Sequence, residues 1–255
     1  MAEKTRVYLA SDARGLSAAE GQGLPCVYLF YRVGDGGALQ RAQLPAAARG
    51  GLMGVFEAPG LADADPPKLA RDMAGECARR GYAGVFLDLA PAPQTVTPLA
   101  ALSQELKRLR VVHYVPVSLL AAAPGARAVV PGAVSGGSFA SLLDELCARW
   151  GADNVALDLQ RMRSVFDMPS FSPEGRALPR EEFDALLGRC RPSVFFSPEL
   201  GCKYFTCREN GRAQFVLFDD ADTAAYKLGL ARQRNLPAVF LLWSEWGPLA
   251  KEIAK

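Results

Sequence analysis

Short apolar runs alternate with amphipathic segments along most of the chain. Apolar positions recur at spacings of three and four in residues 67–80, 98–108, 138–150, 179–190 and 221–234, which predicts helices. Strands that alternate with helices in this way are typical of parallel β/α units. The runs that predict strands are residues 7–10, 26–33, 52–56, 85–88, 111–117, 128–130, 155–159, 194–197 and 238–243.

These elements predict one (β/α)8 TIM barrel. The chain has 255 residues, the length of a single barrel domain, so we expect one domain over residues 1–255. Nine strand-like runs are one too many, and either 128–130 or 155–159 is expected to be the extra strand. A doubly wound open sheet is the competing architecture, but no glycine-rich phosphate loop follows the first strand.

A small β-hairpin insertion is predicted near the C-terminus. Residues 203–207 and 214–218 are apolar runs that flank a turn containing Asn210 and Gly211. Asn-Gly between two such runs is a strong hairpin signal. We expect the hairpin to lie on the top of the barrel. Pro67, Pro98 and Pro179 are expected in first helical turns, where the missing N–H costs no hydrogen bond.

Charge and hydropathy narrow the range of partners and compartments. Lys and Arg total 29 against 27 Asp and Glu, and the basic residues are scattered along the chain. We therefore expect neither a nucleic acid nor a membrane as partner. No apolar stretch reaches the roughly 18 residues of a membrane span, and the first residues lack a signal core. The expected location is the cytoplasm.

Metal and cofactor chemistry is not expected. The one histidine, His113, lies within an apolar run and is expected to be packed, and Cys202 and Cys207 have the wrong spacing for a zinc site. Ser138 precedes a helix, where an N-cap is a better explanation than an anion site. The cysteines are expected to be buried thiols rather than disulfides: Cys26, Cys77, Cys147, Cys190, Cys202 and Cys207.

Residues 81–91 are the most informative stretch of the chain. Their sequence is GYAGVFLDLAP, in which residues 85–87 form a short apolar run of the kind found in strands buried on both faces. Asp88 follows at the carboxyl end of this strand, where barrel active sites are built. The alternative is a carboxylate that caps a helix or fixes the loop.

This stretch resembles the fourth-strand motif of the chitinase-like family 18 glycoside hydrolases. That motif has an Asp-Gly pair, followed by a second Asp, a third Asp and a final Glu that alternate with hydrophobic residues. Asp88 retains the third Asp, whereas Ala83, Phe86 and Ala90 replace the first Asp, the second Asp and the Glu. Residues 27–39, 218–227 and 236–243 resemble the family's second strand, a late helix start and the last strand.

The resemblance implies roles for three residues. Asp88 would orient the acetamido group of the substrate, and Trp243 at the end of the last strand would form the floor of the sugar site, extended by Trp246. The alternative for Trp243 is an ordinary core or rim aromatic. Because the family's proton donor is absent at Ala90, general acid catalysis worth roughly 10²- to 10⁴-fold is expected to be lost.

Other carboxylates follow strand runs and would point towards the top of the barrel. Two carboxyl groups about 5 to 10 Å apart suffice for glycoside hydrolysis, so a relocated acid is chemically possible. Such carboxylates also serve as helix caps and loop ties. The candidates are Glu57, Asp158, Glu199 and Glu245, with Tyr204 and Arg161 as further residues of the cleft.

Three functions follow from these residues. The first is a family 18-like barrel without its catalytic Glu that binds a glycan or another small-molecule ligand. The second is an active glycoside hydrolase on N-acetylglucosamine-containing glycans, with Glu57 or Glu199 opposite Asp88 or Asp158. In the third, the cleft is filled and the barrel is a scaffold.

Overall fold

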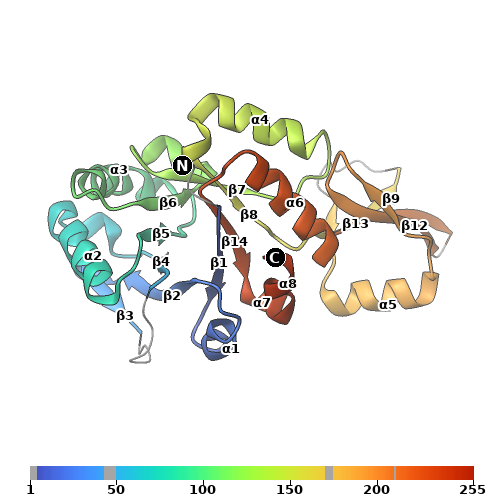
Figure 1. Cartoon of the computed structure of the whole chain (residues 1–255), viewed down its shortest axis with the longest axis horizontal. Coiled ribbons are helices and arrows are strands. Elements are labelled where there is room, and N and C mark those ends of the chain that lie inside the picture. The colour runs from blue at the N-terminus through green and yellow to red at the C-terminus, as the bar shows by residue number, and fades with distance from the viewer. Residues whose placement is uncertain (1–4, 43–49, 170–174, 210) are drawn as a thin grey trace.

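A computed structural model describes residues 5–42, 50–169, 175–209 and 211–255. In these ranges, parallel strands close into an eight-stranded barrel, because β1 pairs with β14 on one side and with β2 on the other (Figure 1). The TIM-barrel prediction is confirmed. Residues 1–4 and Asn210 of the predicted turn lie outside the described residues. The barrel strands are β1 (Arg6–Ser11), β2 (Cys26–Val33), β4 (Leu52–Glu57), β5 (Val85–Leu87), β6 (His113–Pro116), β7 (Arg127–Pro131), β8 (Val155–Asp158) and β14 (Ala238–Leu242).

The predicted choice of the extra strand is wrong. Residues 128–130 and 155–159 both contribute barrel strands, β7 and β8. The run at 194–197 is the one outside the barrel, and it forms β11 (Phe195–Ser197) in a second sheet. A short strand, β3 (Leu39–Arg41), pairs antiparallel with β2 at the barrel's rim.

The predicted helices are present, and all but the one at residues 179–190 cover the outside of the barrel (Figure 1). The helix expected at residue 98 begins earlier, at Pro93, so Pro98 lies inside it and removes one main-chain donor. The helices around the barrel are α1 (Leu16–Glu20), α2 (Pro66–Arg80), α3 (Pro93–Arg108), α4 (Phe139–Trp150), α6 (Ala221–Gln233), α7 (Trp243–Trp246) and α8 (Ala250–Ile253), with 3-10 turns η1 (Asp35–Gly37), η2 (Leu61–Asp63), η3 (Val117–Ala122), η4 (Ala152–Asn154) and η5 (Gly247–Leu249). No helix in the described ranges is both long and apolar enough to cross a bilayer.

An insertion between β8 and β14 forms the right end of the molecule in Figure 1. The predicted hairpin is present as β12 and β13, within a larger antiparallel sheet of order β10-β9-β13-β12-β11. Helix α5 covers one face of the sheet, where Phe183 packs on Phe205 and Phe218. The added elements are β9 (Arg163–Met168), β10 (Arg176–Ala177), α5 (Arg180–Cys190), β12 (Cys202–Glu209) and β13 (Arg212–Phe218).

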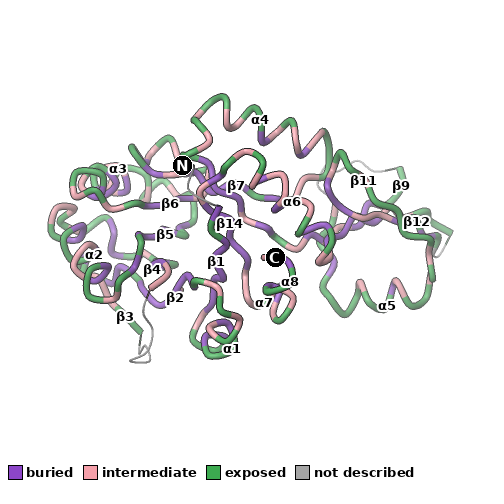
Figure 2. Tube along the Cα trace, in the orientation of Figure 1, coloured by how far each residue is buried: buried purple, intermediate pink, exposed green. Residues whose placement is uncertain are grey.

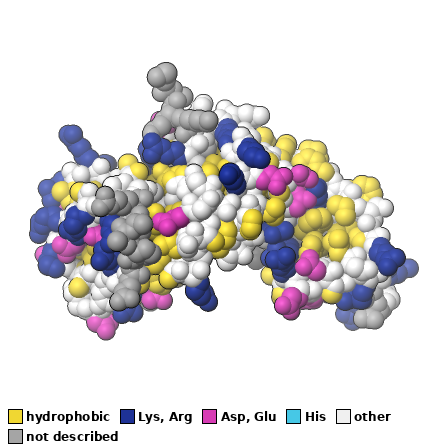
Figure 3. All heavy atoms as spheres, turned by 60° about the horizontal axis from the view of Figure 1, so that its bottom comes forward, with side chains coloured by type: hydrophobic (Ala, Val, Ile, Leu, Met, Phe, Trp, Pro, Cys, Tyr) yellow, Lys and Arg dark blue, Asp and Glu magenta, His cyan; other side chains and the backbone are white. Residues whose placement is uncertain are grey.

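A disulfide joins Cys190 at the end of α5 to Cys207 on β12. The expectation of thiols alone is therefore wrong for this pair, while Cys26, Cys77 and Cys202 are buried and free as predicted. Hydrophobic side chains also gather on the surface of the insertion (Figure 3), and those that are exposed there include Met168, Val194, Phe195 and Phe196.

Aromatic rings fill the interior of the barrel. Phe240 stacks on Phe86 and Tyr8 at centroid distances of 5.1 and 5.7 Å, and Tyr114 meets it edge-on at 5.3 Å. The strands that carry these rings are buried along their length (Figure 2). Phe86, which the resemblance aligned with the second Asp of the motif, therefore has its apolar ring inside the barrel.

A buried ion pair anchors the insertion to the barrel. Lys227 on α6 donates to both carboxylate oxygens of Asp219 at 2.9 Å, and both side chains are only 1% exposed. Asp219 also accepts from the Thr223 hydroxyl at 2.8 Å and from the main-chain N–H of Met162 at 3.2 Å. Asp219 and Met162 lie at the two ends of the insertion, so one carboxylate joins the chain where it leaves the barrel to the chain where it returns.

Candidate functional site

The candidate site is the barrel mouth, which is the end of the barrel at which the eight strands finish. Side chains alternate between the two faces of a strand. Leu52, Phe86 and Ala156 face the interior of the barrel. The same alternation directs Phe56, Asp88 and Asp158 inward at the level of the mouth.

Asp88 directly follows β5, as predicted. Its main-chain N–H donates to the Val55 carbonyl at 2.8 Å, which fixes the residue at the edge of the mouth. The residue is exposed, and its carboxylate has no hydrogen bond or ion pair with the described residues. The surrounding protein desolvates the carboxylate and raises its pKa. Asp88 is therefore available to a ligand.

Asp158, the last residue of β8, is the second carboxylate at the mouth. Burial raises its pKa to about 7, opposed by a hydrogen bond from Gln160 and supported by the charges of Glu245 and Asp88. The Gln160 amide donates to it at 3.1 Å. The charge of Asp88 makes the smallest contribution to this shift, which indicates that the carboxylates following β5 and ending β8 lie at the same end of the barrel.

A hollow of about 460 Å³ adjoins Asp158, a size within the range of small-molecule pockets. Arg161 lines it, as predicted, and Glu245 lies beside it with its carboxylate accepting from the Arg161 main-chain N–H at 2.9 Å. The Arg161 guanidinium donates to the Glu245 carbonyl at 3.0 Å. Glu245 is thus occupied in holding the loop after β8, which favours a structural role for this candidate.

A second hollow, of about 560 Å³, lies between the ends of β4 and the start of α3. Glu57 and Ala90 both line it, so this predicted acid adjoins the residue that the resemblance aligned with the motif's Glu. Phe56 also lines the hollow and is 41% exposed. Since Val55 pairs with Leu87, Phe56 lies beside Asp88 at the strand ends.

Phe56 was not among the predicted site residues. A signal was present, because Phe56 is four residues after the inward-facing Leu52 and so shares its face of the strand. Large apolar side chains at such positions are normally buried in the barrel, so exposure at the mouth distinguishes Phe56 from a core residue.

Glu199 and Tyr204 belong to the insertion and not to the barrel strands. Glu199 is in the turn between β11 and β12, and its carbonyl accepts from the Phe139 N–H at the start of α4 at 2.7 Å. The premise that it follows a barrel strand is wrong, because β11 belongs to the insertion. Tyr204 is on β12, where its ring packs between Phe195 and Phe215 at 5.6 and 5.4 Å.

The two tryptophans do not form the predicted floor. β14 ends at Leu242, so Trp243 begins α7 and packs with the outer hydrophobic layer, its indole so close to Gly15 that a Cβ there would lie 2.2 Å from it. Trp246 is 2% exposed and donates to the Leu159 carbonyl at 2.6 Å. Both rings hold the end of the chain against the barrel.

Two minor predictions are confirmed. His113 is 1% exposed and packed, with its Nε2 atom 2.6 Å from the Ser103 hydroxyl. Ser138 is the N-cap of α4, since its hydroxyl accepts from the Ser141 N–H at 3.3 Å. Across the described ranges, no group of three or more His, Cys, Asp or Glu side chains is arranged to hold a metal ion.

No family model and no curated protein matches the chain. Solved structures do match it. A chitinase from Chromobacterium violaceum is 13% identical, with a TM-score of 0.66 over 98% of this chain and 97% of that one. The fold is that of the family 18 chitinases.

Two further structures support the same conclusion. A GH18 chitinase from Cycas revoluta in complex with (GlcNAc)4 is 13% identical, with a TM-score of 0.63 over 98% of both chains. The spore cortex-lytic enzyme SleL of Bacillus cereus is 10% identical, with a TM-score of 0.65 over 99% of this chain and 74% of that one. The resemblance predicted from the motifs is therefore confirmed for the fold.

Proposed function

We propose that the protein binds a glycan at the barrel mouth and does not cleave it through the family's usual acid. The observation that carries this proposal is the pairing of Phe56 with Asp88. Both are exposed and adjacent, and the Asp88 carboxylate has no partner among the residues that the structure describes. Ala90, which has no proton to donate, stands where the motif has its Glu.

Sugar recognition needs both of these groups. The axial C–H groups of a pyranose pack on an aromatic face, and its hydroxyl and amide groups hydrogen-bond at the ring's edge. Phe56 supplies the face and Asp88 the acceptor. The Cycas revoluta structure holds (GlcNAc)4 on the same fold, which makes oligomers of N-acetylglucosamine the first ligands to test.

Phe56→Ala is expected to weaken glycan binding by roughly fivefold, because a stacked aromatic contributes about 1 kcal/mol beyond its buried area. Calorimetry or ligand-observed NMR with chitin oligomers and peptidoglycan fragments would measure the change. Phe196→Ala is the matched control, since Phe196 is 42% exposed but packs on Tyr226 of α6. Equal losses of glycan affinity in the two variants, or no binding by the native chain, would contradict the proposal.

Hydrolysis with a relocated acid is the second candidate function, and Asp158 is the observation in its favour. A pKa of about 7 keeps much of this carboxyl group protonated near neutral pH, as a general acid requires. Asp88, whose charge reaches Asp158, would then orient the substrate. This assignment differs from the predicted pairs, in which Glu57 or Glu199 is the acid.

If chitin oligomers are cleaved, the rate is expected to fall as the pH rises through about 7, because Asp158 is protonated below its pKa and ionised above it. Asp158→Asn is expected to reduce the rate by roughly 10²- to 10⁴-fold. Glu57→Gln is the control. A loss of activity in Glu57→Gln alone would indicate that Glu57, in the neighbouring hollow, is the acid. Absence of turnover at every pH would exclude this function.

A further inference from the structure

The fifth β/α unit of the barrel lacks a full helix. The strands β4, β5 and β7 are followed by α2, α3 and α4, which have 15, 16 and 12 residues. β6 is followed only by η3, a 3-10 segment of six residues, before β7 begins at Arg127. The outer layer is therefore shallow between the ends of α3 and α4.

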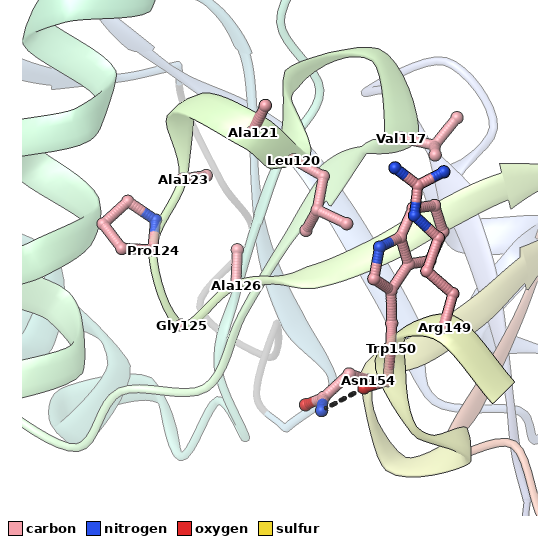
Figure 4. Close-up of a pocket in the computed structure, with 10 residues that line it drawn as sticks. All are labelled: Val117, Leu120, Ala121, Ala123, Pro124, Gly125, Ala126, Arg149, Trp150 and Asn154. Carbon is pink, nitrogen blue, oxygen red and sulfur yellow. Dashed lines mark hydrogen bonds between the residues drawn. The ribbon is translucent and has the colours of Figure 1, made fainter. Parts of the chain in front are cut away.

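A hollow of about 820 Å³ lies at this place (Figure 4). Its apolar wall comes from η3 and the connection to β7, including Val117 and Leu120, and the end of α4 supplies Trp150 opposite them. The Arg149 guanidinium lies over the Trp150 ring at 5.3 Å, and Asn154 donates to the Trp150 carbonyl at 2.8 Å. The aromatic wall is thus fixed from both sides.

A smaller hollow of about 250 Å³ continues from the first, because Gly125 and Asn154 line both. We call the two together the flank groove. Lys107, Arg110 and Arg127 line its second part. Gly125 has φ 84°, and a Cβ there would lie 2.6 Å from Cδ of Lys107. The aliphatic stem of Lys107 therefore packs directly on Gly125, at the junction of the two hollows.

The charge of the flank groove is one-sided. Lys107, Arg110, Arg127 and Arg149 line it, and no Asp or Glu does. None of these four forms an ion pair with any described residue. Elsewhere on the same helices charges are paired, as Arg108 is with Glu105 at 2.7 Å.

The groove's remaining groups do not offset this charge. His113 lines its second part, and burial lowers the pKa of this ring, which favours its uncharged form. It is held by Ser103 and by the Val111 carbonyl, at 2.6 and 3.0 Å. Arg127 donates to the Tyr114 hydroxyl at 3.0 Å, and this partner carries no carboxylate.

We propose that the flank groove binds an acidic segment of a partner protein, with an apolar side chain against Trp150 and carboxylates facing Lys107 and Arg149. Charge complementarity favours an anion, and the apolar wall favours a peptide over a polyanion, because a phosphate backbone would leave Val117 and Leu120 uncovered. The site is on the flank of the barrel and does not depend on the function of the mouth.

The test is selection of binders from a displayed library of random peptides on the full-length chain. The selected peptides are expected to combine an apolar residue with Asp or Glu. Synthetic peptides in which Asn or Gln replaces these acidic residues are expected to bind about tenfold more weakly. Lys107→Glu is expected to cause a similar loss. Arg108→Glu is the control, because this neighbouring charge lies outside the groove and is already paired.

Other outcomes would overturn the proposal. They are a library that yields no binders, binders without acidic residues, equal losses in Lys107→Glu and Arg108→Glu, and binding of a single-stranded oligonucleotide that Lys107→Glu abolishes. Circular dichroism of each variant checks its fold. Lys107→Gln removes the charge without reversing it and is expected to weaken peptide binding less than Lys107→Glu does. Higher salt is expected to reduce the difference in affinity between the native chain and the variant.

Discussion

Replacing Asp219 by asparagine is expected to lower the free energy of unfolding by about 3 to 5 kcal/mol. The substitution keeps the shape of the side chain but leaves the Lys227 ammonium, 1% exposed, without a counter-ion. It also weakens the acceptor that joins Met162 to the start of α6. Urea unfolding followed by circular dichroism would measure the loss.

Two variants distinguish this explanation from a general effect of removing a charge. Asp144→Asn breaks an ion pair with Arg234 in which the Asp144 side chain is 65% exposed. Its effect on the free energy of unfolding is expected to be small. Lys227→Met in the Asp219→Asn background removes the unpaired ammonium and is expected to restore part of the stability. A loss from Asp219→Asn no larger than that from Asp144→Asn would contradict the role of the buried pair.

Glu76→Gln is expected to be nearly as damaging. Glu76 lies on α2 and is 6% exposed. Its carboxylate accepts from the Tyr31 hydroxyl at 2.9 Å, from Arg41 at 3.0 Å and from Arg79 at 2.7 Å. A neutral amide would place two N–H donors against these donors, so a loss of about 2 to 4 kcal/mol is expected on unfolding in urea.

The same carboxylate makes stability depend on acid pH. Burial alone would raise the pKa of Glu76, but hydrogen bonds from Arg79, Tyr31 and Arg41 outweigh it and hold the pKa at about 2. Since the folded pKa lies below the ordinary value of 4.5, the contribution is complete above pH 4.5 and is lost as the pH falls towards 2. The shift corresponds to at most about 3 kcal/mol.

The pH dependence provides a second check on this network. Between pH 4.5 and 2 the native chain is expected to lose more stability than Glu76→Gln, which has no proton to take up at this position. Parallel curves for the two proteins would show that the hydrogen bonds to Glu76 do not stabilise the fold. Glu105→Gln, which removes a surface ion pair with Arg108, is the control.

The architecture was predictable because each barrel strand and helix has its own periodicity. The run at 194–197 was not placed, since three or four apolar residues do not distinguish a parallel barrel strand from an antiparallel edge strand. The pairing of Cys190 with Cys207 was not predictable either. Cys190 and Cys207 are 17 residues apart and meet only because α5 folds back on β12.

The candidate site depended on the end of each strand. Asp88 was placed correctly because a short, fully buried strand precedes it. Trp243 was misplaced by one position: β14 ends at Leu242, and a shift of one residue moves a side chain to the other face of the sheet. Phe56 and the pKa of Asp158 depend on neighbouring strands, which a single stretch of sequence does not reveal.

Phe86 limits which side chains the barrel interior accepts. Its ring stacks 5.1 Å from Phe240 and is one of four aromatic rings that meet there. An aspartate there would remove that stacking and place a carboxylate among Tyr8, Tyr114 and Phe240, at a cost in stability. The aromatic interior therefore accepts a carboxylate at this position only if the rings around it repack.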